Sequence, residues 1–328
     1  MRILIVGAGA VGQVYGQALQ RGGAEVSFFV KPKYADEARA GFRMYQVWRG
    51  RHEARRFEGF GVVTEVAEVA ARPWDQVWFA VAGPAIEGTW VEELVAAAPG
   101  ATIVSLQPGA EAKARMRPVA GDRLVMGVIA FIAWQAPLPG EARFTEPGVA
   151  FWYPPGPSPF SGPRERVAPV VETLRAGGCP ARAVPEMESA TVFGTALLQI
   201  HVAALDAVRW SWPRARSSDV LPLAKRAWRE AVAIGARTSG ERAPLWAPFI
   251  GPWGVRFVMW LAPRILPMDV PTYFGYHFTK VGEQTRKHLD LHIREGTRLG
   301  LPVTALTELR TRMGDQATFD PAETLGKA

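Results

Sequence analysis

The stretch that decides the fold lies at the amino terminus, where residues 2–19 are RILIVGAGAVGQVYGQAL. An apolar run is followed by glycines at positions 7, 9 and 12, and then by apolar residues at helical spacing. Such glycines allow a tight turn, a close approach of the backbone to a pyrophosphate and close packing of helix against strand. The pattern predicts a strand, a turn and a helix that bind a dinucleotide at the helix amino terminus; the alternative is a glycine-rich turn of purely structural use. The predicted cofactor residues here are Gly7, Ala8, Gly9, Ala10, Val11 and Gly12.

Short apolar runs alternate with helical patterns through the first half of the chain. Alternation of apolar and polar residues around Arg49-Gly50 predicts a hairpin over residues 44–57. Further strands, several of them apolar on both faces, are predicted at residues 25–31, 76–82, 102–106 and 124–129. Strands of this kind belong in a parallel sheet covered by helices, so we expect a doubly wound, Rossmann-like α/β domain.

The second half of the chain has a different pattern. A loop rich in Pro, Gly and Ser at residues 154–163 precedes a helix at 164–175 and a short strand near 181–184. Strand patterns then stop, and helical periodicity fills residues 186–210, 219–237, 273–299 and 304–313. We therefore expect an NADP-binding Rossmann domain at residues 1–185 and an all-helical substrate and dimerisation domain at residues 186–328.

Composition excludes several classes of protein. A chain of 328 residues exceeds what one hydrophobic core usually serves, and 48% hydrophobic with 21% charged residues is the balance of a folded chain. The net charge of +7 favours anionic ligands. The single cysteine, Cys179, excludes an internal disulfide and is expected to be an ordinary free thiol. The amino terminus enters a strand without a secretion signal, so the expected location is cytoplasmic.

Two aromatic segments suggest other functions. Residues 246–266 are the most membrane-like stretch, but prolines and arginines interrupt them, so no membrane span is expected. A buried hairpin or a dimer surface is favoured there over an interfacial anchor. The basic loop 209–216 interleaves Trp210 and Trp212, as in nucleic-acid stacking, but no nucleic-acid-binding fold surrounds it, and no nucleic-acid partner is expected.

The end of the second predicted strand bears on the choice of cofactor. NAD-selective sites place an Asp or Glu there, whereas this chain has Lys31-Pro32-Lys33. Two cations favour the 2'-phosphate of NADP, so Lys31 and Lys33 are predicted cofactor residues. The alternatives are two solvated surface lysines, and ribose contacts from Asp36 or Glu37 in the next turn.

Several motifs resemble those of the ketopantoate reductase (2-dehydropantoate 2-reductase) family. They are residues 7–16 with Tyr15-Gly16 on the first helix, Trp74-Asp75-Gln76, Ser105-Leu106-Gln107-Pro108-Gly109, and Gly300-Leu301-Pro302. The resemblance implies a Rossmann domain followed by a helical domain, with the active site in the cleft between them. It also implies NADP-dependent reduction of a 2-oxo acid, a step of pantothenate biosynthesis in that family, and a place for Gln107 beside the cofactor.

The chain departs from the family's pattern where the chemistry takes place. Ala82-Gly83 replaces a Lys-Ala pair, and Pro108 replaces an Asn near the nicotinamide ribose. The family's catalytic Lys and two Asn correspond to Thr191, Thr195 and Gln199, on one face of a helix without lysine. Hydroxyls and an amide bind a carbonyl or carboxylate, but they do not protonate an alkoxide as an ammonium does. Thr191 is the catalytic candidate and the other two are substrate-binding candidates; the alternative is a polar stripe facing solvent, opposite Val192, Phe193, Ala196 and Ile200.

A later helix supplies the remaining candidates. Counting back from Gly300 places Gln284 at the family's catalytic Glu, with Glu283 beside it, and Thr272 at its substrate-binding Ser. Glu283 is therefore the catalytic candidate, and Gln284 and Thr272 are predicted to bind substrate. Lys280 is the predicted catalytic replacement for the missing ammonium, provided that its helix face lines the cleft. The alternative is a solvated helix face with ordinary ion pairs.

Histidines offer further alternatives. His201 and His277 are second choices as proton donors, although His201 has the apolar neighbours of a packed histidine. His288 and His292 have the spacing of metal ligands, but a third ligand is missing, so no metal is expected.

One main expectation and two rivals follow. We expect an NADP(H)-dependent reductase that transfers a hydride to a small 2-oxo acid or related carbonyl substrate and that forms a homodimer. The first rival is a non-catalytic NADP(H) sensor whose helical domain contacts a partner. The second is a reductase for a bulky apolar substrate held by the aromatic stretch 246–260.

Overall fold

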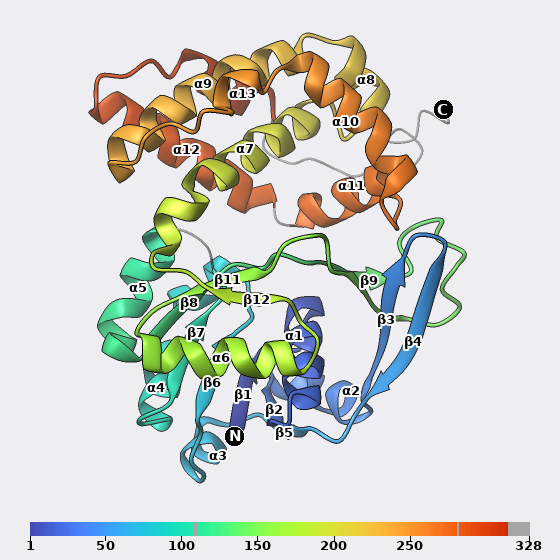
Figure 1. Cartoon of the computed structure of the whole chain (residues 1–328), viewed down its shortest axis with the longest axis vertical. Coiled ribbons are helices and arrows are strands. Elements are labelled where there is room, and N and C mark those ends of the chain that lie inside the picture. Colours follow the sequence, from blue (N-terminus) through green and yellow to red (C-terminus); the bar gives the residue numbers. More distant parts are fainter. Residues whose placement is uncertain (108–109, 281, 314–328) are drawn as a thin grey trace. The chain divides into compact units, whose positions relative to one another are not determined.

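The structure, a computed structural model, describes residues 1–107, 110–280 and 282–313; within them it leaves out the side chains of Pro84, Ala110, Glu111, Glu188, Ser189, Ala190 and Lys280. The chain divides into two units (Figure 1). Unit 1 comprises Met1–Pro137 and Arg143–Glu188, and unit 2 comprises Leu138–Ala142 and the chain from Ser189 onward.

An eight-stranded sheet forms the framework of unit 1. It runs in the order β12-β11-β8-β7-β6-β1-β2-β5, and all neighbouring strands are parallel except β11 and β8. From β1 the chain adds strands β2 and β5 on one side and then continues with β6 on the other side of β1, which creates a switch point between β1 and β6. The strands are β1 (Arg2–Val6), β2 (Glu25–Phe29), β5 (Gly61–Val63), β6 (Gln76–Phe79), β7 (Thr102–Ser105), β8 (Leu124–Gly127), β11 (Ser158–Ser161) and β12 (Ala181–Ala183).

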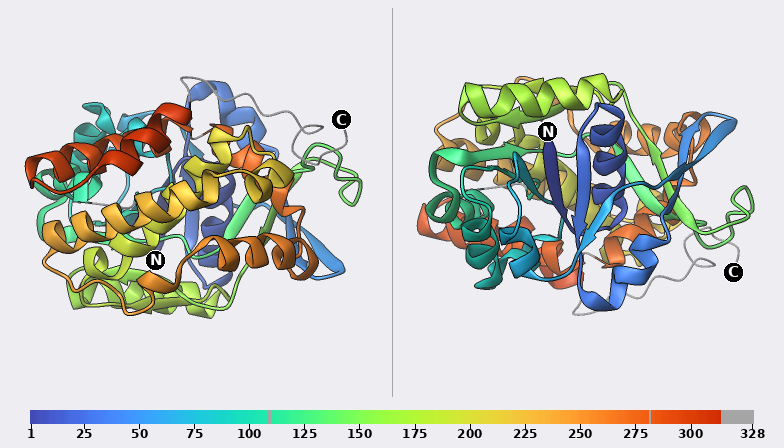
Figure 2. Two further views of the ribbon diagram at one scale, coloured as in Figure 1. Left: turned by 90° about the horizontal axis from the view of Figure 1, so that it is seen from above. Right: turned by 90° about the horizontal axis from the view of Figure 1, so that it is seen from below.

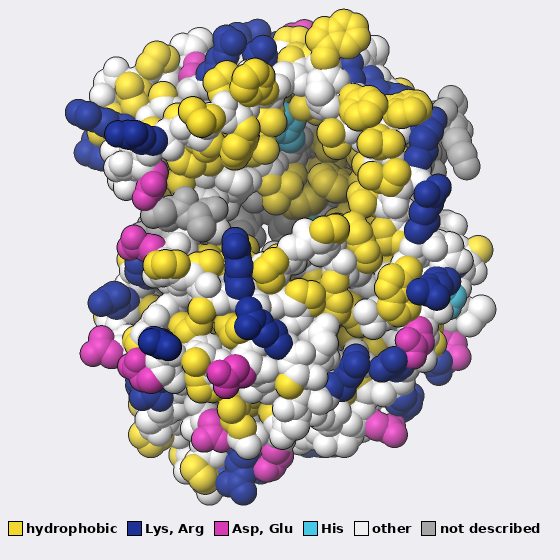
Figure 3. All heavy atoms as spheres, in the orientation of Figure 1, with side chains coloured by type: hydrophobic (Ala, Val, Ile, Leu, Met, Phe, Trp, Pro, Cys, Tyr) yellow, Lys and Arg dark blue, Asp and Glu magenta, His cyan; other side chains and the backbone are white. Residues whose placement is uncertain are grey.

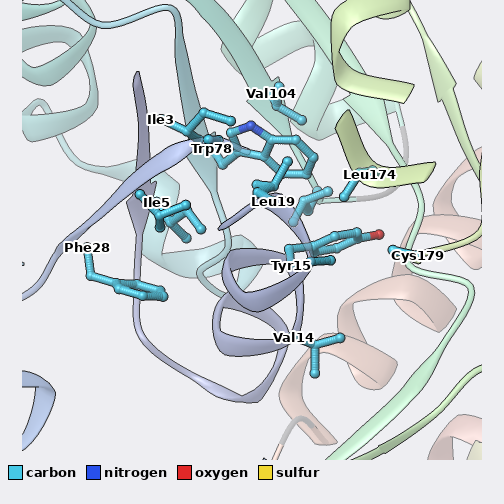
Figure 4. Packing of buried hydrophobic residues seen from close by; sticks show 14 of the residues in the cluster. Ile3, Ile5, Val14, Tyr15, Leu19, Phe28, Trp78, Val104, Leu174 and Cys179 are labelled. Carbon is cyan, nitrogen blue, oxygen red and sulfur yellow. The ribbon is translucent and has the colours of Figure 1, made fainter. Parts of the chain in front are cut away.

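Two helices pack on one face of this sheet, where they contact every second side chain of β1. Ile3 and Ile5 point into a core shared with α1 (Ala10–Arg21) and α6 (Arg164–Ala176). Tyr15 of α1 is fully buried at the centre of this core, and Figure 4 shows its ring close to Trp78, Leu19 and Leu174.

The opposite face carries a second core. Leu4 and Val6, which alternate with the isoleucines of β1, pack with buried residues of α3 (Val66–Ala70), α4 (Trp90–Ala97) and α5 (Ala110–Ala120). Helices therefore lie on both sides of the sheet (Figure 2), and the predicted doubly wound α/β fold is confirmed.

A second sheet in unit 1 runs in the order β4-β3-β10-β9. The hairpin expected at residues 44–57 is present: β3 (Phe42–Trp48) and β4 (Arg51–Phe57) are antiparallel, and Gly50 between them has a φ of 74°. The sequence analysis missed β9 (Ile132–Ala136) and β10 (Gly148–Trp152), which complete this sheet.

The segment 154–163 was wrongly expected to be a loop, because it contains β11. Ser158 and Phe160 are buried, while Pro159 and Ser161 between and after them are half-buried. This period of two is hidden in the sequence, because Ser and Pro occupy strand positions that apolar residues usually fill.

Unit 2 contains no strand among its described residues, as expected for a helical domain. Within unit 2, Glu230 links two helices, because its two carboxylate oxygens accept hydrogen bonds from the backbone N–H groups of Ala305 and Leu306. The helices are α7 (Met187–Ala207), α8 (Trp212–Ser217), α9 (Val220–Ser239), η4 (Ala247–Phe249), α10 (Pro252–Ile265), α11 (Val270–Lys280), α12 (Gly282–Arg298) and α13 (Thr304–Arg312).

The helix expected at 273–299 corresponds to α11 and α12, and residue 281 between them lies outside the described residues. One expectation about unit 2 is wrong. The segment 246–266 is not a buried hairpin, because η4 and α10 are helical and only Met259 and Ala262 of α10 are buried. Among the described residues, no helix has the length and apolar character needed to cross a membrane.

Candidate functional site

The turn after β1 has the geometry that its glycines predict. Gly7 has a φ of 97°, a left-handed conformation that glycine adopts without strain. A Cβ on Gly7 would lie 2.8 Å from Val81 Cγ1, and a Cβ on Gly12 would lie 2.1 Å from the carbonyl oxygen of Gly7. Gln13 Nε2 donates to the carbonyl oxygen of Ala8 at 2.8 Å and so fixes the turn from the helix side. Glycine is required at both positions for packing alone.

Gly9 differs from the other two glycines, because a Cβ there would meet no atom within 4 Å. Gly9 is the N-cap residue of α1, and among the described residues no side chain accepts a hydrogen bond at this cap. The first turn of α1 also contains no acidic residue. Open space in front of an uncapped helix amino terminus is what a phosphate group requires.

The turn borders a cavity of about 690 Å3 within unit 1. Gly7, Ala8 and Gly9 line it, together with the ends of β1 and β2 and residues of α2 (Ala35–Arg39). Ala10, Val11 and Gly12 do not line the cavity; they form the first turn of α1 behind it. The lining is largely apolar, and its polar side chains are Lys31, Tyr34, Glu37 and Thr64.

The two lysines after β2 differ in position. Lys31 lines the cavity, and no carboxylate of the described residues forms an ion pair with it. Lys33 does not line the cavity; its Nζ lies 4.8 Å from the centroid of the Tyr34 ring. Of the two acidic residues that follow, Asp36 pairs with an arginine of its own helix, whereas Glu37 lines the cavity. Lys31 and Glu37 are therefore the charged groups that a bound nucleotide would meet.

Gln107 lies just after the carboxyl end of β7, and its side-chain amide forms hydrogen bonds within unit 1. Nε2 donates to the carbonyl oxygens of Phe79 at 3.0 Å and Val81 at 2.5 Å, and Oε1 accepts from Ser105 Oγ at 2.7 Å. The side chain is buried and links β6 to β7 beside the cavity. Its predicted contact with a cofactor stays a prediction, and Pro108 of the same segment lies outside the described residues.

Arg115 of α5 is a positioning residue that the sequence analysis missed. Its guanidinium donates to the carbonyl oxygens of Ile86 and Gly88 at 3.2 and 3.1 Å and to Glu92 at 2.7 Å. These bonds hold η2 (Gly83–Glu87), the segment that follows β6. The arginine and its partners come from three separate elements, so no local motif in the sequence signals the contact.

The polar stripe on α7 is present in unit 2. Thr191 and Thr195 are half-buried, and Gln199 is buried with no partner for its Oε1 among the described residues. The opposite side of the helix packs inward, since Phe193, Ala196 and Ile200 are all buried. The stripe therefore combines two half-buried hydroxyl groups with one buried amide, and none of these three side chains is a cation.

The candidates on α11 and α12 differ in their surroundings. Thr272 is buried, and its Oγ1 donates to Asp269 Oδ2 at 3.0 Å at the start of α11. Glu283 is exposed and pairs with Lys287 Nζ at 3.2 Å, while Gln284 is half-buried. Lys280 ends α11, and its side chain lies outside the described part of the chain.

Two ionisable residues of α7 have perturbed pKa values: Asp206, which is buried, and His201, which is half-buried. Burial raises the pKa of Asp206 to about 6, although Arg286, at 3.5 Å, acts against this shift. Burial lowers the pKa of His201, and its Nδ1 lies 2.8 Å from the carbonyl oxygen of Leu197. His201 is therefore a packed, mostly neutral histidine at pH 7.

The remaining candidates have ordinary surroundings. Cys179 is a buried free thiol, and burial raises its pKa to about 11. His292 Nδ1 lies 2.8 Å from the carbonyl oxygen of His288, and His277 stacks on Tyr273 with ring centroids 5.2 Å apart. Among the described residues, no group of three or more His, Cys, Asp or Glu side chains is arranged to hold a metal ion.

Comparisons with known proteins agree with this architecture. Residues 3–157 match the family model for the ketopantoate reductase PanE/ApbA. A search of curated proteins found no match to the sequence. Among solved structures, the PanE/ApbA family ketopantoate reductase from Ralstonia eutropha JMP134 has a TM-score of 0.73 at 20% identity, with 95% of this chain and 97% of that chain covered.

Two further solved structures have the same fold. The 2-dehydropantoate 2-reductase from Geobacter metallireducens GS-15 has a TM-score of 0.68 at 17% identity, with 95% of this chain and 99% of that chain covered. D-mandelate dehydrogenase, solved with NADH and anilino(oxo)acetate, has a TM-score of 0.68 at 12% identity, with 95% and 97% covered. Residues 3–157 thus match the model of the ketopantoate reductase PanE/ApbA family, and the chain as a whole has the fold of the solved ketopantoate reductases.

Proposed function

We propose that this chain is a cytoplasmic NADP(H)-dependent reductase of a small 2-oxo acid or related carbonyl compound. The observation that carries the proposal is the environment of Gly9, where open backbone faces a cavity in front of an uncapped helix amino terminus. When bound, a nicotinamide cofactor supplies the hydride for the carbonyl carbon. The protein then has to bind the substrate and deliver a proton to the carbonyl oxygen.

Lys31 supports the choice of NADP over NAD. It lines the cavity at the end of β2, where its ammonium group would form a charge-assisted hydrogen bond with a 2'-phosphate. Glu37 lines the same cavity and opposes this choice, because a carboxylate favours ribose hydroxyls and repels a phosphate. The preference for NADPH therefore depends on Lys31, and Lys33 contributes less than the sequence suggested.

The proposed roles in unit 2 follow the chemistry of each side chain. Thr191, Thr195 and Gln199 offer hydroxyl and amide groups that hydrogen-bond a carbonyl or a carboxylate. Lys280 is the proposed proton donor, since an ammonium stabilises and protonates a developing alkoxide. Gln284 is proposed to bind the substrate, whereas Glu283, the other catalytic candidate, is less suitable because it is exposed and paired with a lysine.

The rival function is a non-catalytic NADP(H) sensor. Two observations favour it. Thr272, a proposed substrate residue, already donates its hydroxyl hydrogen to Asp269, and α7 contains no lysine. A sensor would keep the nucleotide cavity of unit 1 and lose the proton donor. The same pattern is expected of a reductase whose proton donor has moved to another helix.

Oxidation of NADPH separates the two functions. The purified protein is incubated with NADPH and a panel of 2-oxo acids that ranges from ketopantoate to acids with bulky apolar side chains. The proposed reductase oxidises NADPH with at least one of them, and preference for the bulky acids would favour the apolar-substrate rival. NADPH binding without turnover on any 2-oxo acid would support the sensor.

We also propose a homodimer. The support is another solved structure of this fold, the ketopantoate reductase from Staphylococcus aureus, which is described as dimeric and has a TM-score of 0.65 at 10% identity. Light scattering coupled to size-exclusion chromatography gives the mass directly. A mass equal to one chain of 35.8 kDa at all concentrations would contradict the proposal.

A further inference from the structure

The most exposed aromatic residues of unit 2 lie around α10. Leu245 is 92% exposed, Phe249 84%, Trp253 82% and Phe257 58%, and Trp260 is also exposed. These five residues form what we call the aromatic face. Single exposed apolar residues are ordinary in folded proteins, but several large ones within sixteen residues of chain indicate a surface that contacts something other than water.

The geometry of α10 keeps this face outward. Trp253, Phe257 and Trp260 follow one another at spacings of four and three residues, so they share one side of the helix. Phe257 and Trp260 are stacked, with ring centroids 5.9 Å apart. The buried residues of the helix, Met259 and Ala262, are the ones that face the rest of unit 2. The aromatic side chains are thus not a poorly packed part of the core.

Arginines accompany the aromatic rings. The guanidinium of Arg256 lies 5.7 Å from the Trp253 ring, and that of Arg264 lies 4.4 Å from the Trp260 ring. Arg256 Nε also donates to the carbonyl oxygen of Arg216 at 2.9 Å, which fixes it beside α8. Figure 3 shows yellow and dark-blue side chains mixed over the part of unit 2 where Figure 1 labels α10.

In the described part of the chain, little negative charge lies on α10 or on the helices that pack against it. The chain contains no Asp or Glu between Glu241 and Asp269. Helices α9 and α11, which pack against α10, contain one carboxylate, Glu230, and it is engaged with backbone N–H groups at the start of α13. The aromatic face is therefore apolar and cationic at once.

We propose that the aromatic face binds an anionic lipid surface, with α10 lying in the plane of the headgroups. Trp and Phe rings favour the boundary between headgroups and acyl chains, and arginines are attracted to anionic lipids. A second copy fits the face less well, because a two-fold axis through it would bring the same arginines of both copies together without a carboxylate. The inference is independent of the proposed reductase activity, since it places the protein on a membrane whatever reaction it performs.

Sedimentation with vesicles tests the proposal on the full chain. The protein is mixed with vesicles of phosphatidylcholine and phosphatidylglycerol in equal parts, and in parallel with vesicles of phosphatidylcholine alone. We expect the protein to sediment with the anionic vesicles, to stay largely in solution with the neutral ones, and to dissociate as salt is added, because surface charges are screened.

Paired variants assign the binding to this face. The triple variant Phe249→Ser, Trp253→Ser, Phe257→Ser should lower the vesicle partition coefficient by more than about tenfold, since it removes three large apolar groups from the boundary. Leu198→Ser, at an exposed leucine on α7, is the matched control and should have little effect. The double variant Arg256→Gln, Arg264→Gln should lower the partition coefficient by about 30-fold. Arg294→Gln, at an exposed arginine on α12, is its control.

Three results would overturn the proposal. One is the absence of binding to anionic vesicles, and another is equal binding by the variants and the unmutated protein. The third is a combined result in which the unmutated protein is a dimer that does not bind vesicles, and the triple variant is a monomer. That result would show that the face contacts a second copy of the chain. Circular dichroism and NADPH titration check that each variant folds, and the single variant Phe249→Ser, at a residue 84% exposed, replaces the triple variant if that one does not fold.

Discussion

The glycine turn of unit 1 and helix α7 of unit 2 both resemble the ketopantoate reductase pattern in sequence, but the resemblance differs between them. The turn keeps its glycines and its open helix amino terminus, whereas α7 keeps the spacing of polar groups and lacks the lysine. Phosphate binding at such a turn uses backbone N–H groups, which survive most substitutions. Proton transfer uses one ionisable side chain, so a single substitution removes it or moves it elsewhere.

The largest expected effect tests whether the proton donor has moved from α7 to α11. Lys280→Met should lower turnover by about 10² to 10⁴ while NADPH affinity stays nearly unchanged, because general acid catalysis typically contributes this much. Steady-state kinetics and NADPH titration measure the two quantities separately. Lys225→Met, at a lysine of α9, is the matched control and should turn over normally. Normal turnover by Lys280→Met would show that Lys280 is not the donor.

The reverse substitution sharpens the same comparison. Thr191→Lys places an ammonium on α7 at the position that we propose, from the sequence resemblance, to correspond to the catalytic lysine of ketopantoate reductases. It should create or raise activity toward ketopantoate, because Thr195 and Gln199 remain on the same helix face. Steady-state assays with ketopantoate compare the variant with the unmutated protein. No gain in any assay would mean that the rest of the stripe does not bind the substrate.

Substitutions at two glycines of the turn test folding and nucleotide binding separately. Gly12→Ala places a Cβ 2.1 Å from a backbone oxygen and should destabilise unit 1 by about 3 kcal/mol. Gly9→Val meets open space, so the protein should fold normally and bind NADPH about 10- to 100-fold more weakly. Thermal denaturation and fluorescence titration distinguish the two variants. Full NADPH affinity in a folded Gly9→Val protein would reduce the motif to a structural turn.

Asp206 is the acid of α7 whose titration is predicted to affect stability. Its pKa is about 6 in the folded protein and 3.8 is the ordinary value, so the unfolded chain loses the proton first as pH rises. The free energy of unfolding should therefore fall on the order of 2 kcal/mol between these two pH values. Asp206→Asn should remove that part of the pH dependence in denaturant titrations. Parallel stability curves for both proteins would contradict the assignment.

The smallest expected effect concerns the cofactor. Lys31→Ala should lower NADPH affinity by about tenfold and leave NADH affinity nearly unchanged, because the lost contact involves the 2'-phosphate. Lys33→Ala is the neighbouring control and should change little, since Lys33 lies over the Tyr34 ring and does not line the cavity. Equal affinities of the unmutated protein for NADPH and NADH, measured at fixed salt, would show that Glu37 outweighs Lys31.

The sequence predicted the central sheet well because its signals are local. The run from Arg2 to Val6 matches β1 at both ends, and alternate burial of its residues follows from strand geometry. Strands β10 and β11 were harder to predict. Pro159 and Ser161 in β11 hide the alternation, and the pairing of β10 with β3 joins residues about a hundred positions apart, which no short window detects.

The candidate site was predictable only in part. Gly7 and Gly9 were found because their spacing has a physical cause that is visible in the sequence. Arg115 was missed, since its partners lie on η2 and α4 and nothing in its own helix indicates them. The sequence offered both Asp36 and Glu37 as alternative ribose ligands. Only the structure separates them, because Glu37 lines the cavity and Asp36 does not.

Transfer of deuterium from NADPH is the most direct test of the central claim that this chain is a reductase. NADPH deuterated at the transferable position of the nicotinamide is incubated with the protein and the panel of 2-oxo acids, and the acids are analysed by mass spectrometry. The account predicts a 2-hydroxy acid with deuterium on its second carbon, formed by the unmutated protein and much less by Lys280→Met. Tight NADPH binding with no deuterium in any 2-hydroxy acid would contradict it.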